Sequence, residues 1–279
     1  MRLDPWGRLR DARYALPGYV ERRLGGPNAA AAVRTANALR HKGLAATIGY
    51  FQASHDGADD IVAANSEVAA LLGGDARDVY LSVKAPPLSF DGGRLRTIAR
   101  AGRAAGLGLL FDAHAAGDAD RTLDTVSALL PDFPGTGCAL PARWRRSSAD
   151  AERFRDTTAR IRIVKGEWAD PERDQTSIEA SYIGLIAALA GRAGTVAVAT
   201  HDPALAERAL AVLVDAGTPC ELEQLRGLPG RRTLSVARRL DVPVRVYVPF
   251  GPGWWPYALD KALARPYLAS WMIRDALGA

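Results

Sequence analysis

The stretch TVAVATHDPALAERALAVLVDAGTPCELE, residues 195–223, decides the fold. Its β-rich run at 195–200 leads into a helix-period stretch at 203–216, which stops at Gly217 before a second β-rich run at 219–223. A strand, a helix and a strand in this order form the unit from which parallel sheets with crossover helices are built. The unit predicts an α/β protein.

The same alternation runs along the whole chain. Predicted strands occupy residues 45–50, 78–83, 108–112, 137–140, 161–164, 195–200, 219–223 and 242–248. Predicted helices occupy residues 29–41, 59–72, 93–105, 119–130, 149–159, 177–193, 203–216, 233–239, 255–265 and 267–277. Eight strand–helix units in about 235 residues is the count for a closed barrel, and no G-x-G-x-x-G motif follows a strand. We therefore expect residues 1–279 to form one (β/α)8 TIM-type barrel domain, with a helical extension at about 1–43.

The amino-acid composition argues against several classes of function. The net charge is +5, but the arginines are spread among acidic residues, which argues against a nucleic-acid partner. No apolar run approaches the ~20 residues of a membrane span. Cys138 and Cys220 lie in apolar segments, which is typical of buried thiols in a reducing cytoplasm. No two His or Cys residues share ligand spacing, so no metal site is expected.

Catalytic groups of a (β/α)8 barrel come from the C-terminal ends of its strands. That rule selects Lys84, Asp112, His114, Lys165, Thr200, His201, Glu223 and Tyr247, and Arg162 has the inward-facing parity of its strand. Lysine is rare in this chain, which has four, so two lysines at strand ends carry weight. Structural interpretations remain open: Lys84 with Asp112 as an ion pair, His201 as a helix cap, and Tyr247 as a core residue with a satisfied hydroxyl.

Several segments resemble the proline dehydrogenase family. They are IRIVKGEW at 161–168, ATH at 199–201, ELEQL at 221–225, VRVYVPFG at 244–251 and WWPY at 254–257. The strand ends LSVK at 81–84 and FD at 111–112 also fit, and the similarity runs in order from about Ala29 to Tyr267. The resemblance implies FAD, rather than FMN, held at the barrel mouth without a Rossmann domain.

The resemblance also implies roles for single residues. The implied catalytic residues are Lys84, Asp112, Arg162 and Tyr247. The implied cofactor-binding residues are Arg162, Val164, Gly166, Thr200, His201 and Glu223. The implied substrate-binding residues are Lys84, Asp112, Trp168, Leu225, Tyr247, Tyr257, Asp260 and Lys261. Arg162 would lie near flavin N5, where a cation stabilises the reduced, anionic ring.

Several positions depart from the family pattern. Where the family has two adjacent arginines that bind the proline carboxylate, this chain has Asp260 and Lys261. Neither aspartate nor lysine can form the paired hydrogen bonds that an arginine makes to a carboxylate. Two family glutamines near the flavin are Pro141 and Glu223 here. These departures point away from proline as the substrate.

The leading hypothesis is a flavin-dependent dehydrogenase that oxidises a C–N bond of a proline-like or other small amine to an imine, with hydride transfer to flavin N5. Its electron acceptor is left open between a quinone and oxygen. One alternative is a biosynthetic amine or hydrazine oxidase of the same fold that is unrelated to proline. Another is a barrel lyase that uses Lys84 or Lys165 as a Schiff-base nucleophile. A third is a flavin- or ligand-binding barrel without turnover.

Overall fold

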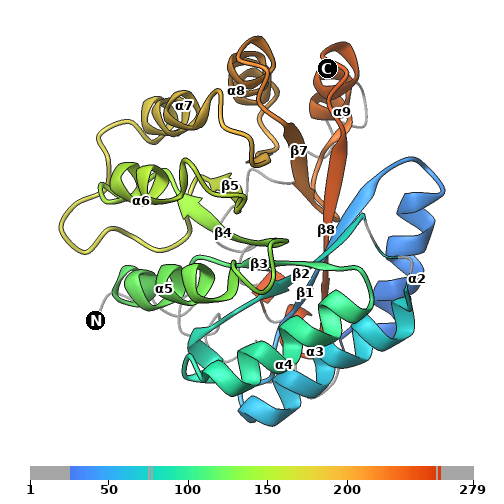
Figure 1. The fold of residues 1–279 in the computed structure, drawn as a ribbon. Coiled ribbons are helices and arrows are strands. Elements are labelled where there is room, and N and C mark those ends of the chain that lie inside the picture. The colour runs from blue at the N-terminus through green and yellow to red at the C-terminus, as the bar shows by residue number, and fades with distance from the viewer. Residues whose placement is uncertain (1–25, 75, 77, 256, 259–279) are drawn as a thin grey trace, which may run out of the picture.

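The computed structural model describes residues 26–74, 76, 78–255 and 257–258. Eight parallel strands close into a barrel in chain order, with β8 paired to β1 (Figure 1). The strands are β1 Ala45–Tyr50, β2 Val79–Val83, β3 Gly108–Phe111, β4 Thr136–Pro141, β5 Arg160–Val164, β6 Val196–Ala199, β7 Cys220–Leu225 and β8 Val244–Phe250. The predicted barrel is confirmed, and each predicted strand overlaps an observed one.

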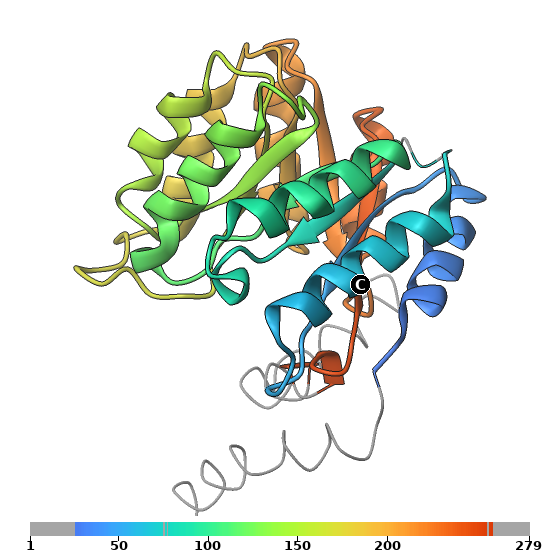
Figure 2. The ribbon, with the colours of Figure 1, turned by 60° about the horizontal axis from the view of Figure 1, so that its bottom comes forward.

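The helices lie outside the barrel (Figure 1). They are α2 Ala29–Arg40, α3 Ala58–Leu72, α4 Gly92–Ala104, α5 Ala119–Leu129, α6 Ser147–Phe154, α7 Ile178–Leu189, α8 Pro203–Asp215 and α9 Arg231–Arg239. Short 3-10 turns, Pro86–Leu88 and Ala116–Asp118, follow β2 and β3. Figure 2 shows α3 beside α4 along one flank, where the two helices pack together. The predicted extension up to residue 25, and the predicted helices at 255–265 and 267–277 beyond residue 258, lie outside the described residues.

Side-chain caps set several helix starts. Asp202 accepts hydrogen bonds from the backbone N–H groups of Ala204 and Leu205, and Pro203 opens α8. Asn28 caps α2 in the same way through the N–H of Ala31. These caps satisfy N–H groups that have no partner inside the helix. In the described part of the chain, no helix is both long and apolar enough to cross a membrane.

The two faces of the strands carry different chemistry. Outward-facing residues such as Ile163, Val198 and Leu222 are fully buried against the helices and form the apolar core. The inward-facing residues of β5, β7 and β8 are mostly charged: Arg160, Arg162, Glu221, Glu223 and Arg245, all at most 6% exposed. Small residues make room for them. Ala139 and Ala197 are the register partners of Arg162 on the two neighbouring strands.

Candidate active site

Asp112 is the centre of a hydrogen-bonded cluster at the C-terminal ends of the strands. Its carboxylate accepts from Ser82 Oγ at 2.6 Å and from the Tyr247 hydroxyl at 3.2 Å. The Arg162 guanidinium donates to the same carboxylate, and Lys84 Nζ lies 3.7 Å from it. Burial would raise the pKa of Asp112, but the charges of Arg162 and Lys84 outweigh burial and lower it. Asp112 is therefore held as a carboxylate.

Arg162 lies between two carboxylates. One terminal nitrogen contacts Asp112, and the other lies 3.2 Å from Glu223 Oε1. Burial alone would lower the pKa of the guanidinium, but Glu223 and Asp112 raise it above its ordinary value. Two atoms of this pair, Arg162 Nε and Glu223 Oε2, are buried without a hydrogen-bond partner among the described residues.

Lys84 is held by three different groups. Its Nζ donates to the Tyr50 carbonyl at 2.7 Å, lies near Asp112, and sits 4.1 Å from the centre of the Phe51 ring. Burial lowers the pKa of Lys84, and the charge of Arg162 lowers it further, while Asp112 opposes both. The predicted pairing of Lys84 with Asp112 is present.

Tyr247 depends on a glycine in the neighbouring strand. A Cβ atom on Gly49 would overlap the Tyr247 hydroxyl, so only glycine leaves that hydroxyl its place beside Asp112. Burial also raises the pKa of Tyr247 well above its ordinary value, and Asp112 adds to the effect. The hydroxyl is therefore a donor to Asp112 rather than a phenolate.

Aromatic rings surround the mouth. Phe51 packs against Trp254 and Tyr257, with ring centroids 5.3 and 5.0 Å apart, and meets Tyr247 edge-on at 6.5 Å. The Tyr257 hydroxyl donates to Glu167 Oε2 at 2.9 Å. This cluster presents aromatic faces beside carboxylates, an environment that suits a cation.

His114 and Trp168 form a stacked pair after β3 and β5, with centroids 6.1 Å apart and an interplanar angle of 25°. Trp168 is 47% exposed. Burial lowers the pKa of His114, and the charge of Lys84 lowers it further.

The remaining predicted cofactor residues lie at the ends of β5 and β6 or directly after them. The two ring nitrogens of His201 bridge backbone groups: Nδ1 lies 2.6 Å from the Pro229 carbonyl, and Nε2 accepts from the Leu225 N–H at 3.0 Å. Thr200 accepts from the Asp202 N–H. The Val164 carbonyl accepts from the Ala142 N–H.

Gly166 and Lys165 complete this side of the mouth. Gly166 has φ +100°, and a Cβ atom there would lie 2.9 Å from Arg143 and from Pro141. Lys165 is half exposed, with its Nζ 3.9 Å from Asp202. Asp260 and Lys261 lie outside the described residues.

Sequence reasoning missed three contributors. Ser82 has the inward parity of Lys84 and could have been found from that parity, and Phe51 follows β1 as the strand-end rule requires. Glu167 lies between two predicted site residues, but its contact with Tyr257 depends on a loop conformation that the pattern does not encode.

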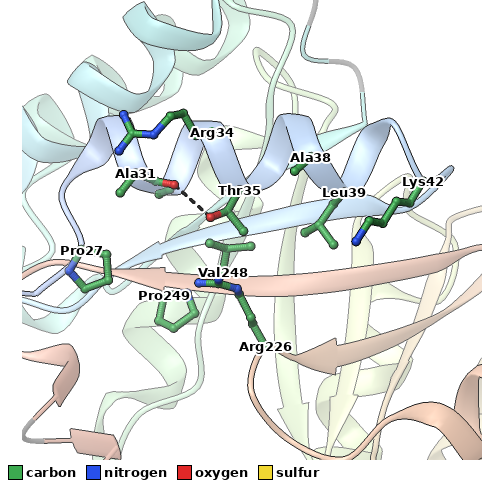
Figure 3. A pocket seen from close by; sticks show the side chains of 11 residues that line it. Pro27, Ala31, Arg34, Thr35, Ala38, Leu39, Lys42, Arg226, Val248 and Pro249 are labelled. Carbon is green, nitrogen blue, oxygen red and sulfur yellow. Dashed lines mark hydrogen bonds between the residues drawn. The ribbon is translucent and has the colours of Figure 1, made fainter.

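A cavity of about 470 Å3 lies away from this cluster, on the outer side of the barrel between α2 and β8 (Figure 3). Its apolar floor includes Leu39, Val248 and Pro249, and Arg34, Lys42 and Arg226 stand around it. None of the residues of the Asp112 cluster lines it.

A closed parallel barrel with buried charged groups at its C-terminal mouth is the architecture of (β/α)8 barrel enzymes. The sequence profile of one family, proline dehydrogenase, matches residues 32–253. The chain belongs to the proline dehydrogenase family and is an oxidoreductase.

Individual relatives are distant. The chain is 24% identical over 276 residues to proline dehydrogenase 1 of Bacillus subtilis subsp. natto, covering 92% of this chain and 90% of the relative. It is 25% identical over 166 residues to proline dehydrogenase of Deinococcus radiodurans, covering 57% of this chain and 54% of the relative. The fold is similar to that of proline utilization A from Bdellovibrio bacteriovorus, with a TM-score of 0.75 and 19% identity over 88% of this chain. The chain spans about a third of that larger protein, 32% of its length.

Proposed function

We propose that this chain is a cytoplasmic, FAD-dependent dehydrogenase that oxidises a C–N bond of a small amine to an imine. The observation that carries the proposal is the pair of unpartnered buried atoms, Arg162 Nε and Glu223 Oε2, in a family of dehydrogenases. A buried donor and a buried acceptor without partners each cost about 1–3 kcal/mol, so a native site that keeps both is expected to satisfy them with a ligand.

The residues present fit a flavin. Arg162 and Glu223 would face the polar edge of the ring, which carries both hydrogen-bond donors and acceptors, while Val164 and Gly166 would lie along it. Lys165 and Thr200 would stand on the phosphate side, since both follow strands at the same end of the barrel. When bound, flavin supplies a hydride acceptor at N5.

The residues of the mouth would then position the amine. Lys84, Asp112 and Tyr247 form one rigid network, since Asp112 is the common acceptor. Hydride loss needs the neutral amine, because a protonated nitrogen withdraws electrons from the neighbouring C–H bond. His114 stacks on Trp168 and has a pKa lowered by burial, so its neutral imidazole would take up that proton.

Charges at the mouth favour an amine without a carboxylate. In the described part of the mouth, Arg162 and Lys84 both contact Asp112, and Arg143 pairs with Asp174 at 3.0 Å. Each cation already has an anionic partner, so a substrate carboxylate would have to displace one. Aromatic rings beside Glu167 suit a cationic or uncharged amine better.

The test is anaerobic bleaching of the bound flavin by a panel of amines. We expect pyrrolidine or another amine without a carboxylate to bleach the flavin at least tenfold faster than L-proline. Fast bleaching by proline would contradict the preference, and a purified protein that binds no flavin under saturating FAD would contradict the proposal as a whole.

One observation favours a second candidate, a Schiff-base lyase. Lys84 is buried with a lowered pKa beside Asp112, which is the setting of nucleophilic lysines. Borohydride in the presence of carbonyl compounds would trap a substrate on Lys84 in that case, and the Lys84→Arg variant would not be labelled.

A further inference from the structure

Glu223 differs from Asp112 in how its carboxylate is used. Asp112 has donors on both oxygens: Ser82 and Arg162 on Oδ1, and Tyr247 on Oδ2. Glu223 accepts one hydrogen bond, from Arg162 at 3.2 Å, and its Oε2 has no hydrogen-bond partner among the described residues. Yet Glu223 is the more deeply buried of the two, at 3% exposure. A buried carboxylate that is only half satisfied is expensive unless something further approaches it.

Its position limits what that partner is. Glu223 faces the barrel interior on β7, with Ala199 of β6 and Arg245 of β8 as register partners. Ala199 is too small to reach it, and Arg245 is engaged with Glu221 at 2.6 Å and with the Ala46 carbonyl at 2.6 Å. Neither register partner gives the second oxygen a hydrogen bond, which leaves Glu223 Oε2, like Arg162 Nε, open to a bound group.

We propose that Glu223 accepts an N–H of the bound flavin and, by offsetting the charge of Arg162, lowers the reduction potential of that flavin. This inference rests on the proposed function. Without Glu223, the two cations Arg162 and Lys84 and the carboxylate of Asp112 would present a net charge of +1 to the ring, which favours the reduced, anionic form. The carboxylate of Glu223, in the same buried site of low dielectric, largely cancels that net charge.

Glu223 would therefore affect the reduction and the reoxidation of the flavin in opposite directions. A lower potential makes electron uptake from the amine less favourable and electron transfer to the acceptor more favourable. Glu223 is a positioning residue in this scheme, because it acts on the ring and on Arg162 rather than on the substrate.

The chain contains a matched control in the same strand. Glu221 is two residues before Glu223, faces the same interior, is 5% exposed and pairs with the buried arginines Arg160 and Arg245. Two residues of strand place it about 6.6 Å further from the mouth. Glu221→Gln therefore removes an equivalent buried charge at a greater distance from the flavin.

The experiment measures the midpoint potential of the flavin bound to the full chain, in the parent, Glu223→Gln and Glu221→Gln. We expect Glu223→Gln to favour the reduced flavin at least tenfold, a positive shift of about 30 mV for a two-electron couple. Glu221→Gln should shift the potential by less than a third of that amount. The affinity for oxidised FAD, read from flavin fluorescence, should change less than the affinity for the reduced form.

An unchanged or more negative potential in Glu223→Gln overturns the inference, as does an equal shift in both variants. A parent protein that binds no FAD overturns the proposed function instead, so the two failures are distinguishable. If Glu223→Gln does not fold, Glu223→Ser removes the same charge and leaves room for a water, and the same positive shift is expected. Glu223→Asp keeps the charge and should stay near the parent potential.

Discussion

At the scale of single residues, Asp112 shows why Lys84 and Arg162 are not equivalent cations. Arg162 presents a fork that reaches Asp112 and Glu223 together, which a single ammonium group cannot do. Lys84 contributes a point charge, directed by the Tyr50 carbonyl and the Phe51 ring. Removal of Arg162 would leave Glu223 without its hydrogen-bond donor and Asp112 with only Lys84 as a neighbouring cation, whereas removal of Lys84 leaves Asp112 with its three hydrogen-bond donors.

This difference predicts the behaviour of Lys84→Met. Because Asp112 keeps Ser82, Tyr247 and Arg162, the free energy of unfolding should fall by only about 1–3 kcal/mol, mostly from the orphaned Tyr50 carbonyl. Amine oxidation should fall at least a hundredfold, since the side chain that orders the mouth is gone. Urea denaturation and single-turnover flavin bleaching measure the two effects. Lys42→Met is the control, because Lys42 is exposed and lies outside the barrel. Comparable losses of stability and activity in Lys84→Met would instead favour a purely structural ion pair between Lys84 and Asp112.

At the scale of the elements, the alternation of strand and helix patterns predicted the barrel, because eight such units are the number that closes one. Inward parity placed Arg162 inside the barrel, and the strand-end rule selected Lys84, Asp112 and Tyr247. The structure brings these four side chains together. The parity also implies that Ser82 and Glu223 share the interior. What periodicity could not predict is contact across loops, such as Tyr257 with Glu167 or His201 with Pro229. Those contacts depend on loop conformations without a repeating pattern.

The role of Gly49 in β1 is a second feature that the strand pattern could not predict. Gly49→Ala would drive a Cβ atom into the Tyr247 hydroxyl, which must then leave its place beside Asp112. We expect a loss of about 1–3 kcal/mol from overpacking and a loss of activity similar to that of Tyr247→Ala. Gly184→Ala in α7 is the control, because its Cβ would meet no atom within 4 Å and should stabilise the helix by up to about 1 kcal/mol. Thermal melts and flavin bleaching of both variants check the prediction, and a fully active Gly49→Ala protein would show that Tyr247 tolerates displacement.

At the scale of the whole molecule, the barrel separates its apolar core from its charges. The core lies between the strands and the helices, and the interior of the barrel is occupied by ion pairs from one end to the other. In the lower part, Arg160 and Arg245 share Glu221, and both guanidinium groups lie 4.7 Å from the centre of the Tyr80 ring. The Arg162 cluster fills the upper part. Stability therefore depends on the protonation of buried groups, and pH should affect folding and the mouth together.

His114 is the group through which mildly acidic pH should act. Burial and Lys84 lower its pKa in the folded protein, against the opposing charges of Asp112, Asp118 and Glu167. The unfolded chain takes up a proton near pH 6.5, before the folded protein does, so acidification below about 6.5 favours unfolding. Asp112 adds a second loss only at lower pH, because its folded pKa is depressed below its unfolded value near 3.9. We expect the melting temperature of the parent to fall more steeply from pH 6.5 to 5 than that of His114→Gln, while the exposed control His41→Gln follows the parent. Parallel curves for the parent and His114→Gln would assign the acid sensitivity to other groups.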